Sequence, residues 1–270
     1  MVTRIYTDNK YIRLLVALPL LLIATLLFVL MPVTFGDWMD YFRPAASNWL
    51  QPYRPGIFNP PWLFLLLYPL TLLPARLGVG LLMMASVIIV MAYVKSPAKV
   101  IAVMCSAPMI ALLTLGQIDA LPLLGMAIPN GLGLPLILIK PQGTFLAGLR
   151  RLNRWSIAVV LLVSAISVLI WGFWWLNMDR TVPLGRSHDV SLFPYTIGVG
   201  AVLLYLGIKR GSDALLCWAS LCFSPYFMIT SALAAVSASV KETEDWKWWA
   251  AVVLGSWVYL LVARGSIFAV

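Results

Sequence analysis

Apolar residues form long runs in this chain, and short polar segments separate them. The runs cover about residues 14–31, 76–94, 100–116, 118–139, 155–176, 194–208, 213–236 and 246–263. Most of them approach the roughly 20 residues that an α-helix needs to cross the hydrocarbon core of a bilayer. The pattern therefore predicts an all-α, polytopic transmembrane helix bundle of about eight spans, with residues 1–270 forming a single integral membrane domain.

Composition also indicates a membrane protein. Of the 270 residues, 62% are hydrophobic and only 11% are charged, so a water-soluble domain could not bury its apolar surface. The 12 Trp and 10 Tyr residues suit the headgroup level of a bilayer, where aromatic rings are enriched. Lys and Arg outnumber Asp and Glu by 19 to 10, but no basic run lies on a soluble domain. The excess therefore indicates cytoplasmic loops and no nucleic-acid partner.

The distribution of basic residues predicts the orientation of the spans. Basic residues gather before residue 14 and in the segments 95–99, 140–154 and 209–210. The positive-inside rule places these segments, and with them both termini, in the cytoplasm. The run at 14–31 is predicted to be an uncleaved first span, with a cleaved signal peptide as the alternative, because no small-residue cleavage site follows it.

Two apolar segments do not fit a simple crossing. If residues 61–74 crossed the bilayer, the basic cluster at 140–154 would face outward. We therefore expect 61–74 to be re-entrant or interfacial and residues 33–75 to form an outer juxtamembrane loop. Residues 118–139 are predicted to span, with Asp119 outside and Lys140 inside, but prolines and glycines interrupt them. Such a broken helix is tolerated only beside protein or a water-filled cavity, so we expect a cavity here.

The outer loop carries a candidate general base. Asp37 and Asp40 are three residues apart and would share one face of a helix, with Tyr41 and Arg43 close by. A carboxylate at the outer edge of a membrane cavity can take a proton from a hydroxyl group. Two other interpretations stay open: a solvated acidic loop, or Asp37 as the N-cap of a helix over residues 38–48.

Arginines on the same predicted side favour an anionic ligand. Five of them are expected on the outer face: Arg43, Arg54, Arg76, Arg180 and Arg186. A guanidinium presents a planar fork to phosphate or carboxylate, although each side chain could instead reach toward lipid headgroups.

Other polar residues have two interpretations each. His188 is the single histidine; it could shuttle a proton or bind a headgroup, or it is an ordinary loop residue. Without a second histidine we expect no metal site. Gln117 and Asp119 either line a cavity or make hydrogen bonds between helices. The three cysteines lie in apolar runs without metal-ligand spacing and are expected to be packing residues.

Five segments, taken in order, resemble the GT-C superfamily of polytopic glycosyltransferases. They are GDWMDYFRPA (36–45), QPY (51–53), NPPWLFLLLYPLTLLP (59–74), LGQIDALPLLGMA (115–127) and IKPQ (139–142). The likeness covers about residues 10–145 and is greatest to the bacterial polyprenyl-phosphate-mannose-dependent mannosyltransferases. It implies a bundle of GT-C type in the bacterial inner membrane, with juxtamembrane helices in the first outer loop.

The resemblance also implies an activity and its residues. Asp37 matches the catalytic Asp, and the family motifs match Tyr41, Pro52, Tyr53, Asn59, Pro60, Pro61, Gln117 and Lys140. The implied reaction transfers a hexose, mannose in the closest relatives, from a polyprenyl-phosphate donor to a glycan, lipid or protein acceptor on the outer face, with inversion. The expected substrate-binding residues are Asp40, Tyr41, Arg43, Tyr53, Arg54, Asn59, Gln117, Arg180, Arg186 and His188. No cofactor is expected besides the lipid-linked sugar, which serves as co-substrate.

Two other functions remain open. Asn59 replaces the usual aromatic residue of its motif, and the chain is shorter than typical members of the family. Both features favour a non-catalytic subunit that keeps the fold inside a larger membrane complex. Broken helices also suit a lipid or solute transporter, although no clear repeat pairs the two halves.

Overall fold

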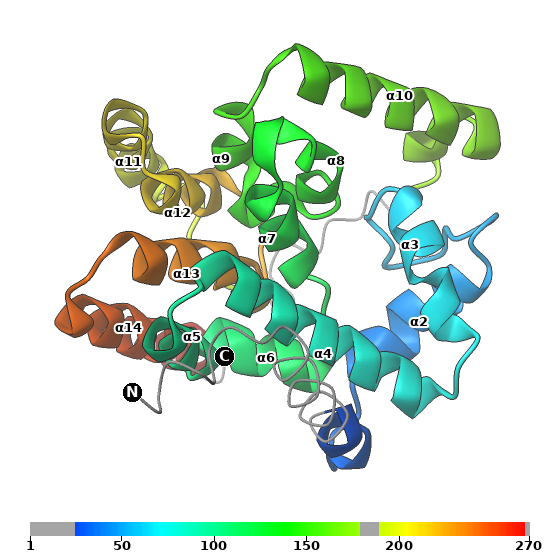
Figure 1. Ribbon diagram of the computed structural model, residues 1–270, viewed down its shortest axis with the longest axis horizontal. Coiled ribbons are helices and arrows are strands. Elements are labelled where there is room, and N and C mark those ends of the chain that lie inside the picture. The colour runs from blue at the N-terminus through cyan, green and yellow to red at the C-terminus, as the bar shows by residue number, and fades with distance from the viewer. Residues whose placement is uncertain (1–24, 179–188, 268–270) are drawn as a thin grey trace, which may run out of the picture.

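The computed structural model describes residues 25–178 and 189–267, and these residues form helices and connections without any strand (Figure 1). The helices, in chain order, are η2 (Asp37–Phe42), α2 (Arg43–Ser47), α3 (Trp62–Thr71), α4 (Ala75–Val94), α5 (Pro97–Met104), α6 (Ala107–Leu115), α7 (Ala120–Ala127), η3 (Pro129–Gly131), α8 (Leu134–Ile137), η4 (Pro141–Gly143), α9 (Phe145–Leu149), α10 (Arg154–Trp171), η5 (Trp174–Leu176), α11 (Ile197–Arg210), α12 (Asp213–Phe223), η6 (Ile229–Ala232), α13 (Leu233–Glu242) and α14 (Trp246–Ile267). The predicted all-α class is confirmed.

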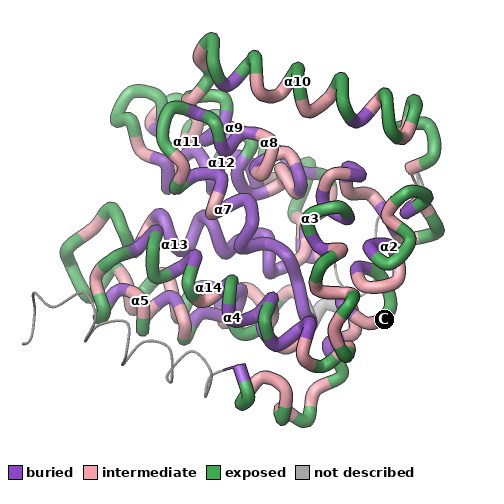
Figure 2. The backbone as a smooth tube through the Cα atoms, turned by 45° about the vertical axis from the view of Figure 1, so that its right-hand side comes forward, coloured by how far each residue is buried: buried purple, intermediate pink, exposed green. Residues whose placement is uncertain are grey.

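Three of the described helices are long and apolar enough to cross a membrane. They are α4, α10 and the Trp246–Ala263 part of α14; the α5–α6 pair is a fourth if it counts as one span bent by 66°. Only 11% of the α10 span and 6% of the α14 span are buried, whereas 61% of α4 is buried. Figure 2 shows this contrast, with buried residues concentrated on α4, α7, α12 and α13. The exposed apolar faces of α10 and α14 are therefore suited to contact lipid.

The α5–α6 break is bridged by α14. The Trp257 indole N–H donates to the carbonyl of Cys105 at 2.9 Å, and the backbone N–H of Ala107 donates to Ser256 Oγ at 3.1 Å. Side chains of α14 thus satisfy backbone groups that the bend removes from the helical ladder.

Residues 118–139 form a hairpin, so the prediction that they cross as one span is wrong. α7 and α8 are joined through η3, and the Lys140 ammonium lies 2.7 Å from the Asp119 carboxylate. The two ends of the segment are therefore adjacent. Gly125 and Gly133 allow the two arms to touch, because a Cβ at Gly133 would lie 2.1 Å from the Gly125 carbonyl oxygen. Residues 141–151 then run back to the end of the molecule where Asn130 lies. α10 therefore begins on the side of the membrane that was predicted for it.

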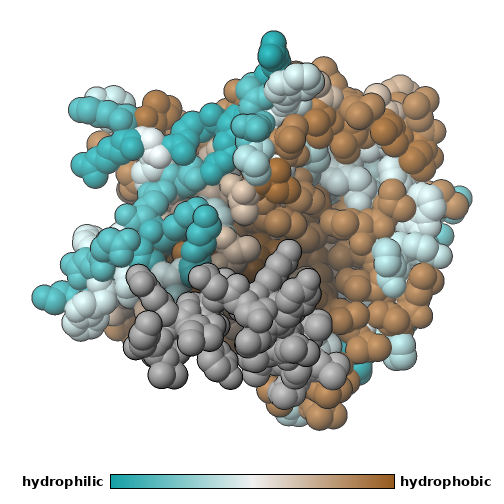
Figure 3. Space-filling view, in the orientation of Figure 1, coloured by the Kyte–Doolittle hydropathy of each residue, from teal (hydrophilic) through white to brown (hydrophobic). Residues whose placement is uncertain are grey.

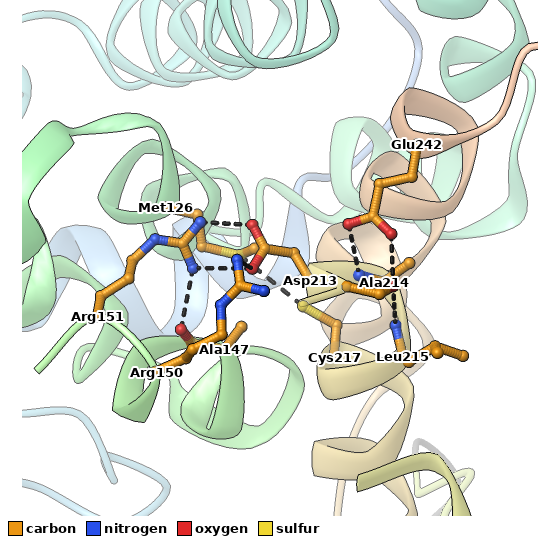
Figure 4. A network of polar contacts seen from close by, with 10 residues as sticks. Met126, Ala147, Arg150, Arg151, Asp213, Ala214, Leu215, Cys217 and Glu242 are labelled. Carbon is orange, nitrogen blue, oxygen red and sulfur yellow. Dashed lines mark hydrogen bonds and ion pairs between the residues drawn. The ribbon is translucent and has the colours of Figure 1, made fainter. Parts of the chain in front are cut away.

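Residues 213–242 form a second hairpin, which corrects the predicted span at 213–236. α12 leads to a turn at residues 224–228, and η6 and α13 return. The Glu242 carboxylate accepts hydrogen bonds from Ser212 Oγ at 2.5 Å and from the Ala214 backbone N–H at 3.1 Å. Figure 4 shows Glu242 beside the start of α12. Neither hairpin arm is long enough to cross a bilayer by itself.

Basic residues gather at one end of the molecule, which we call the basic end: Lys95, Lys99, Arg150, Arg151, Lys209 and Arg210. Ion pairs and hydrogen bonds link them through the hairpin ends, since Lys99 lies 2.7 Å from Glu244 while Asp213 pairs with Arg150 and Arg151. In Figure 3 hydrophilic side chains gather on the left, where Figure 1 shows α11 and the α13–α14 connection. Apolar side chains gather at the upper right and on the right of the same view.

The start of α14 belongs to the basic end, which corrects its predicted orientation. A predicted span at 246–263 with a cytoplasmic C-terminus would place Glu242, Glu244 and Asp245 outside, but Lys99 of the predicted cytoplasmic segment contacts Glu244. Farther along α14, the Tyr259 hydroxyl bonds to the Val190 carbonyl, and Val190 pairs with Phe227 at the tip of the second hairpin. α14 therefore runs away from the basic end, and its C-terminal part does not return there.

The segment 61–74 is a helix of only 10 residues, α3. At 1.5 Å per residue it is about 15 Å long, roughly half the thickness of the hydrocarbon core. This length agrees with the predicted non-crossing segment. The predicted first span at 14–31 falls mostly outside the described residues.

Candidate functional site

A π-helical turn places Asp37 on the wall of a cavity. In η2 the backbone N–H of Arg43 donates to the carbonyl of Trp38, a bond over five residues that widens the turn. Asp37 and Tyr41 consequently face the same cavity, whereas Asp40 is exposed and does not line it. The expected pairing of Asp37 with Asp40 on one face is replaced by Asp37 with Tyr41.

The turn after α6 brings Gln117 against Asp37. Gly116 has a φ of 74°, and a Cβ there would lie 2.8 Å from the Cβ of Trp38. Only glycine lets η2 and this turn approach so closely. Trp38 is fully buried, and its indole N–H donates to the Ala75 carbonyl at 3.2 Å, which ties η2 to the start of α4.

Four polar side chains form a chain that we call the Asp37 relay: Asp37, Gln117, Lys140 and Asp119. The Gln117 amide Nε2 donates to Asp37 Oδ2, while Lys140 Nζ donates to Gln117 Oε1 at 3.1 Å. The same Nζ pairs with Asp119 at 2.7 Å. Because Lys140 can only donate, it fixes the orientation of the Gln117 amide so that the NH₂ group faces Asp37.

The relay is largely withdrawn from solvent. The side chains of Lys140 and Asp119 are 10% and 4% exposed, and Gln117 is 3% exposed. An ammonium group has three N–H donors, and two of those on Lys140 are used within the relay. The third is available to a ligand in the cavity that Lys140 lines.

The cavity beside Asp37 has a volume of about 520 Å³, which suits a small organic ligand. It is lined by residues from the first loop, the turn after α6, the first hairpin, the middle of α10, the η5 segment and the tip of the second hairpin. A second, more apolar cavity of about 620 Å³ lies next to it between η4, α9 and α12. Both cavities are lined by Phe58, Pro141, Gln142 and Tyr226. The two spaces are therefore neighbours with a common wall.

Aromatic rings form one side of the first cavity. Trp174 stacks on Tyr53 with ring centroids 6.5 Å apart and meets Trp62 and Trp175 edge-on. The indole N–H of Trp174 and the side-chain oxygen Oε1 of Gln142 are both buried without a hydrogen-bond partner. Buried polar atoms usually have partners, so a donor and an acceptor in one cavity wall suit a ligand rich in hydroxyl groups.

Tyr53 and Asn59 brace the cavity wall. The Tyr53 hydroxyl donates to the Asn59 carbonyl at 3.3 Å, and burial raises the pKa of this phenol well above its usual value, so it stays protonated. The Asn59 side chain donates to the Ile139 carbonyl at 3.0 Å. Asn59 thus ties the first loop to the first hairpin, and Lys140 follows directly.

The arginines of the first loop that were expected to bind phosphate donate hydrogen bonds to backbone carbonyl groups instead. Arg43 Nη2 donates to the carbonyls of Thr71 and Leu73, and Arg54 Nη2 donates to those of Asp40 and Tyr41. Neither side chain lines the cavity. Among the described residues that do line it, Lys140 is the only cation. Arg180, Arg186 and His188 lie outside the described residues.

The expected substrate-binding residues did not include Lys140, Asp119, Gln142 or Trp174, although Lys140 matched a family motif and Asp119 was considered as a cavity-lining residue. Lys140 was assigned to the cytoplasm because basic residues follow it, although the matched motif around it pointed to the site. Gln142 shares that motif. Within the described part of the chain no cluster of His, Cys, Asp and Glu could hold a metal ion.

Comparisons with protein-family models, with curated proteins and with solved structures gave no match.

Proposed function

We propose that this chain is a membrane glycosyltransferase that moves a hexose from a polyprenyl-phosphate donor to an acceptor hydroxyl on the outer face of a bacterial inner membrane, with inversion. The observation that carries the proposal is the Asp37 carboxylate on the wall of a cavity that adjoins an apolar cavity. The first space suits a sugar and the second suits the first isoprene units of its lipid. The resemblance of the loop sequences to mannosyltransferases makes mannose the preferred hexose.

The unpartnered polar atoms and the rings support a sugar ligand. Trp174 and Gln142 line the cavity, and a rotation of either side chain would let the unpartnered Trp174 Nε1 donate to a hydroxyl group or Gln142 Oε1 accept from one. Aromatic faces beside them offer apolar contact to the C–H groups of a pyranose ring.

The proposed reaction needs one base and one cation. The acceptor O–H gives its proton to Asp37, and the oxygen attacks the anomeric carbon from the side opposite the phosphate. The bond from carbon to phosphate oxygen breaks, and its electron pair stays on the phosphate. Lys140 faces the cavity with one remaining N–H and would stabilise the charge that develops on that oxygen. Asp37 and the cavity hold the two reactants in line.

Sugar transfer from a radiolabelled polyprenyl-phosphate hexose tests the proposal, with purified protein in lipid and an envelope extract as acceptor source. Asp37→Asn removes the base, so we expect the initial rate to fall by a factor of about 10² to 10⁴. Asp40→Asn is the matched control, because this exposed carboxylate lies three residues away and does not line the cavity. Its rate should stay within about twofold of wild type.

Absence of transfer by wild type, in an extract that supports a related enzyme, would refute the proposal and favour a non-catalytic subunit of a larger membrane complex. That alternative predicts no open cavity above Asp37, whereas a cavity of about 520 Å³ lies beside this carboxylate.

A lipid or solute transporter is a second candidate, favoured by the two hairpins. They enter from opposite ends of the molecule, and the tip of the second one brings Tyr226 and Met228 to the cavity that Gln117 lines. Buried ionisable groups such as the Lys140–Asp119 pair are also typical of transport pathways. Uptake of a labelled lipid-linked sugar into proteoliposomes without any acceptor would favour this function over transfer.

A further inference from the structure

A polar pocket opens at the basic end, beside the turn of the first hairpin, and shares no residue with the Asp37 relay. Its volume is about 390 Å³, and it is lined by the end of α7, the turn at 128–131 and residues 150–153. Arg150 and Arg151 are the charged residues among those that line it. This pocket takes no part in the proposed transfer reaction.

The two arginines have different roles. Arg151 donates to both carboxylate oxygens of Asp213 and to the Ala147 carbonyl, so its guanidinium is held in place as part of the fold. The described contact of Arg150 is one ion pair, from Nη2 to Asp213 Oδ1 at 2.8 Å. Figure 4 shows both guanidinium groups beside the single Asp213 carboxylate. The group therefore carries one uncompensated positive charge.

Arg150 is also the accessible member of the group. Its side chain is 37% exposed, compared with 19% for Arg151 and 12% for Asp213. Lys209 and Arg210 are exposed at the end of α11, and a Cβ added at Gly211 would lie 3.2 Å from Arg150 Nη1, so this end of α11 lies beside the guanidinium. The local potential is thus positive around a guanidinium whose remaining N–H groups can reach a ligand.

The pocket wall is rigid before any ligand arrives. The Asn153 side chain donates to the Asn130 carbonyl at 2.7 Å and to the Arg151 carbonyl at 3.2 Å, which joins the hairpin turn to the start of α10. Its Oδ1 accepts from the backbone N–H groups of Trp155 and Ser156. A preformed wall reduces the entropy lost when a ligand binds.

The depth of the pocket indicates a lipid. Residues 150–153 directly precede α10, one of the helices that can span the membrane. Leu152, Trp155 and Ile157 are 46%, 61% and 48% exposed. Exposed apolar and indole side chains at the end of a span lie at headgroup level, so the pocket opens where lipid phosphates are found.

We propose that this pocket binds the phosphate of an anionic phospholipid, with Arg150 donating to the phosphate oxygens and Arg151 holding the site in shape. Basic pockets between helices on the cytoplasmic side are suited to such headgroups. Inorganic phosphate would offer Arg150 the same acceptor oxygens as the phosphate of a lipid headgroup. The apolar surface beside the pocket favours the lipid as its source.

The test is lipid retention by native mass spectrometry of the purified full chain in detergent. Phosphatidylglycerol is titrated, with phosphatidylcholine as the zwitterionic comparison. We expect wild type to retain phosphatidylglycerol preferentially and Arg150→Gln to bind it roughly tenfold to a hundredfold more weakly, because one charge-assisted contact is lost. Arg150→Lys keeps the charge and should recover part of the affinity.

Lys209→Gln is the matched control, since it removes an equal charge from an exposed residue at the same end that does not line the pocket. Equal losses in Lys209→Gln and Arg150→Gln would overturn the proposal, because they would indicate general surface charge. Displacement of the lipid by equimolar inorganic phosphate would also overturn it and identify free phosphate as the ligand. Circular dichroism of Arg150→Gln without lipid checks that this variant is folded. If it is not folded, the titration of Arg150→Lys decides. Phosphatidylglycerol binding by Arg150→Lys that is as weak as phosphatidylcholine binding would then refute the proposal.

Discussion

At the residue scale, the Asp37 relay shows how one lysine can organise a site without contacting the proposed base. Lys140 lies between a buried carboxylate, Asp119, and an amide, Gln117, whose other end faces Asp37. The resemblance predicted Asp37, Gln117 and Lys140 as motif residues. It could not predict that Lys140 and Asp119 meet, because a charge count assigns each residue to a side without knowing that the chain turns back between them.

We expect the Lys140–Asp119 ion pair to add little net stability, whereas removal of one partner alone should destabilise the protein strongly. Lys140→Met leaves Asp119 buried and unpaired, and we expect this to destabilise the protein by about 3–5 kcal/mol. The double variant Lys140→Met/Asp119→Leu removes both charges and should regain most of that loss. Thermal unfolding in detergent measures both variants. A double variant less stable than Lys140→Met would show that the pair itself contributes net stability.

At the element scale, the two hairpins are the main departure from the predicted spans. In the first of them, Pro129 and the glycines after it mark the turn between α7 and α8, whereas Pro122 lies within α7 and Pro135 in the first turn of α8. A sequence pattern cannot distinguish a bent crossing from a return, since both have the same apolar length. The distinction is made by contacts at the ends, such as Glu242 with Ser212.

The first hairpin depends on the contact between Gly125 and Gly133. A Cβ at Gly133 would meet backbone atoms of Gly125 at 2.1 and 2.7 Å, which no side-chain rotation relieves. Gly133→Ala should therefore lower stability by about 1–3 kcal/mol or more and weaken the relay that the hairpin carries.

Gly198→Ala is the matched control, because nothing lies within 4 Å of the added Cβ on α11. Helix propensity predicts a gain of up to about 1 kcal/mol there. Unfolding midpoints of the two variants can be compared directly. A Gly133→Ala protein as stable as Gly198→Ala would contradict the close packing of α7 and α8.

At the scale of the whole molecule, the charged ends define which segments share a membrane face. The all-α class, α4 and the non-crossing α3 followed from apolar run length and charge bias. The orientation of α14 did not follow, because Glu242, Glu244 and Asp245 were assigned to one side of the membrane by counting the predicted crossings before them. The second hairpin starts and ends at the basic end, so α14 begins on the side opposite to the predicted one.

Cysteine accessibility checks this arrangement in sealed, oriented vesicles, using a background without the three native cysteines. Lys95→Cys and Thr243→Cys should react with a membrane-impermeant reagent from the same side, since the segments that carry them are joined by the Lys99–Glu244 pair. Leu72→Cys, at a position 69% exposed just before α4, should react from the opposite side, because α4 is long enough to cross and ends beside Lys95. Labelling of positions 95 and 243 from different sides would restore the originally predicted topology.

The bridge from α14 to the α5–α6 break has a consequence for biosynthesis. The Cys105 carbonyl and the Ala107 N–H are made early, but their partners Trp257 and Ser256 lie in the last helix of the described chain. In lipid, backbone groups without partners are costly. Until α14 has been synthesised, these two backbone groups of the nascent protein therefore lack the partners that they have in the folded chain. Translation through α14 supplies both partners.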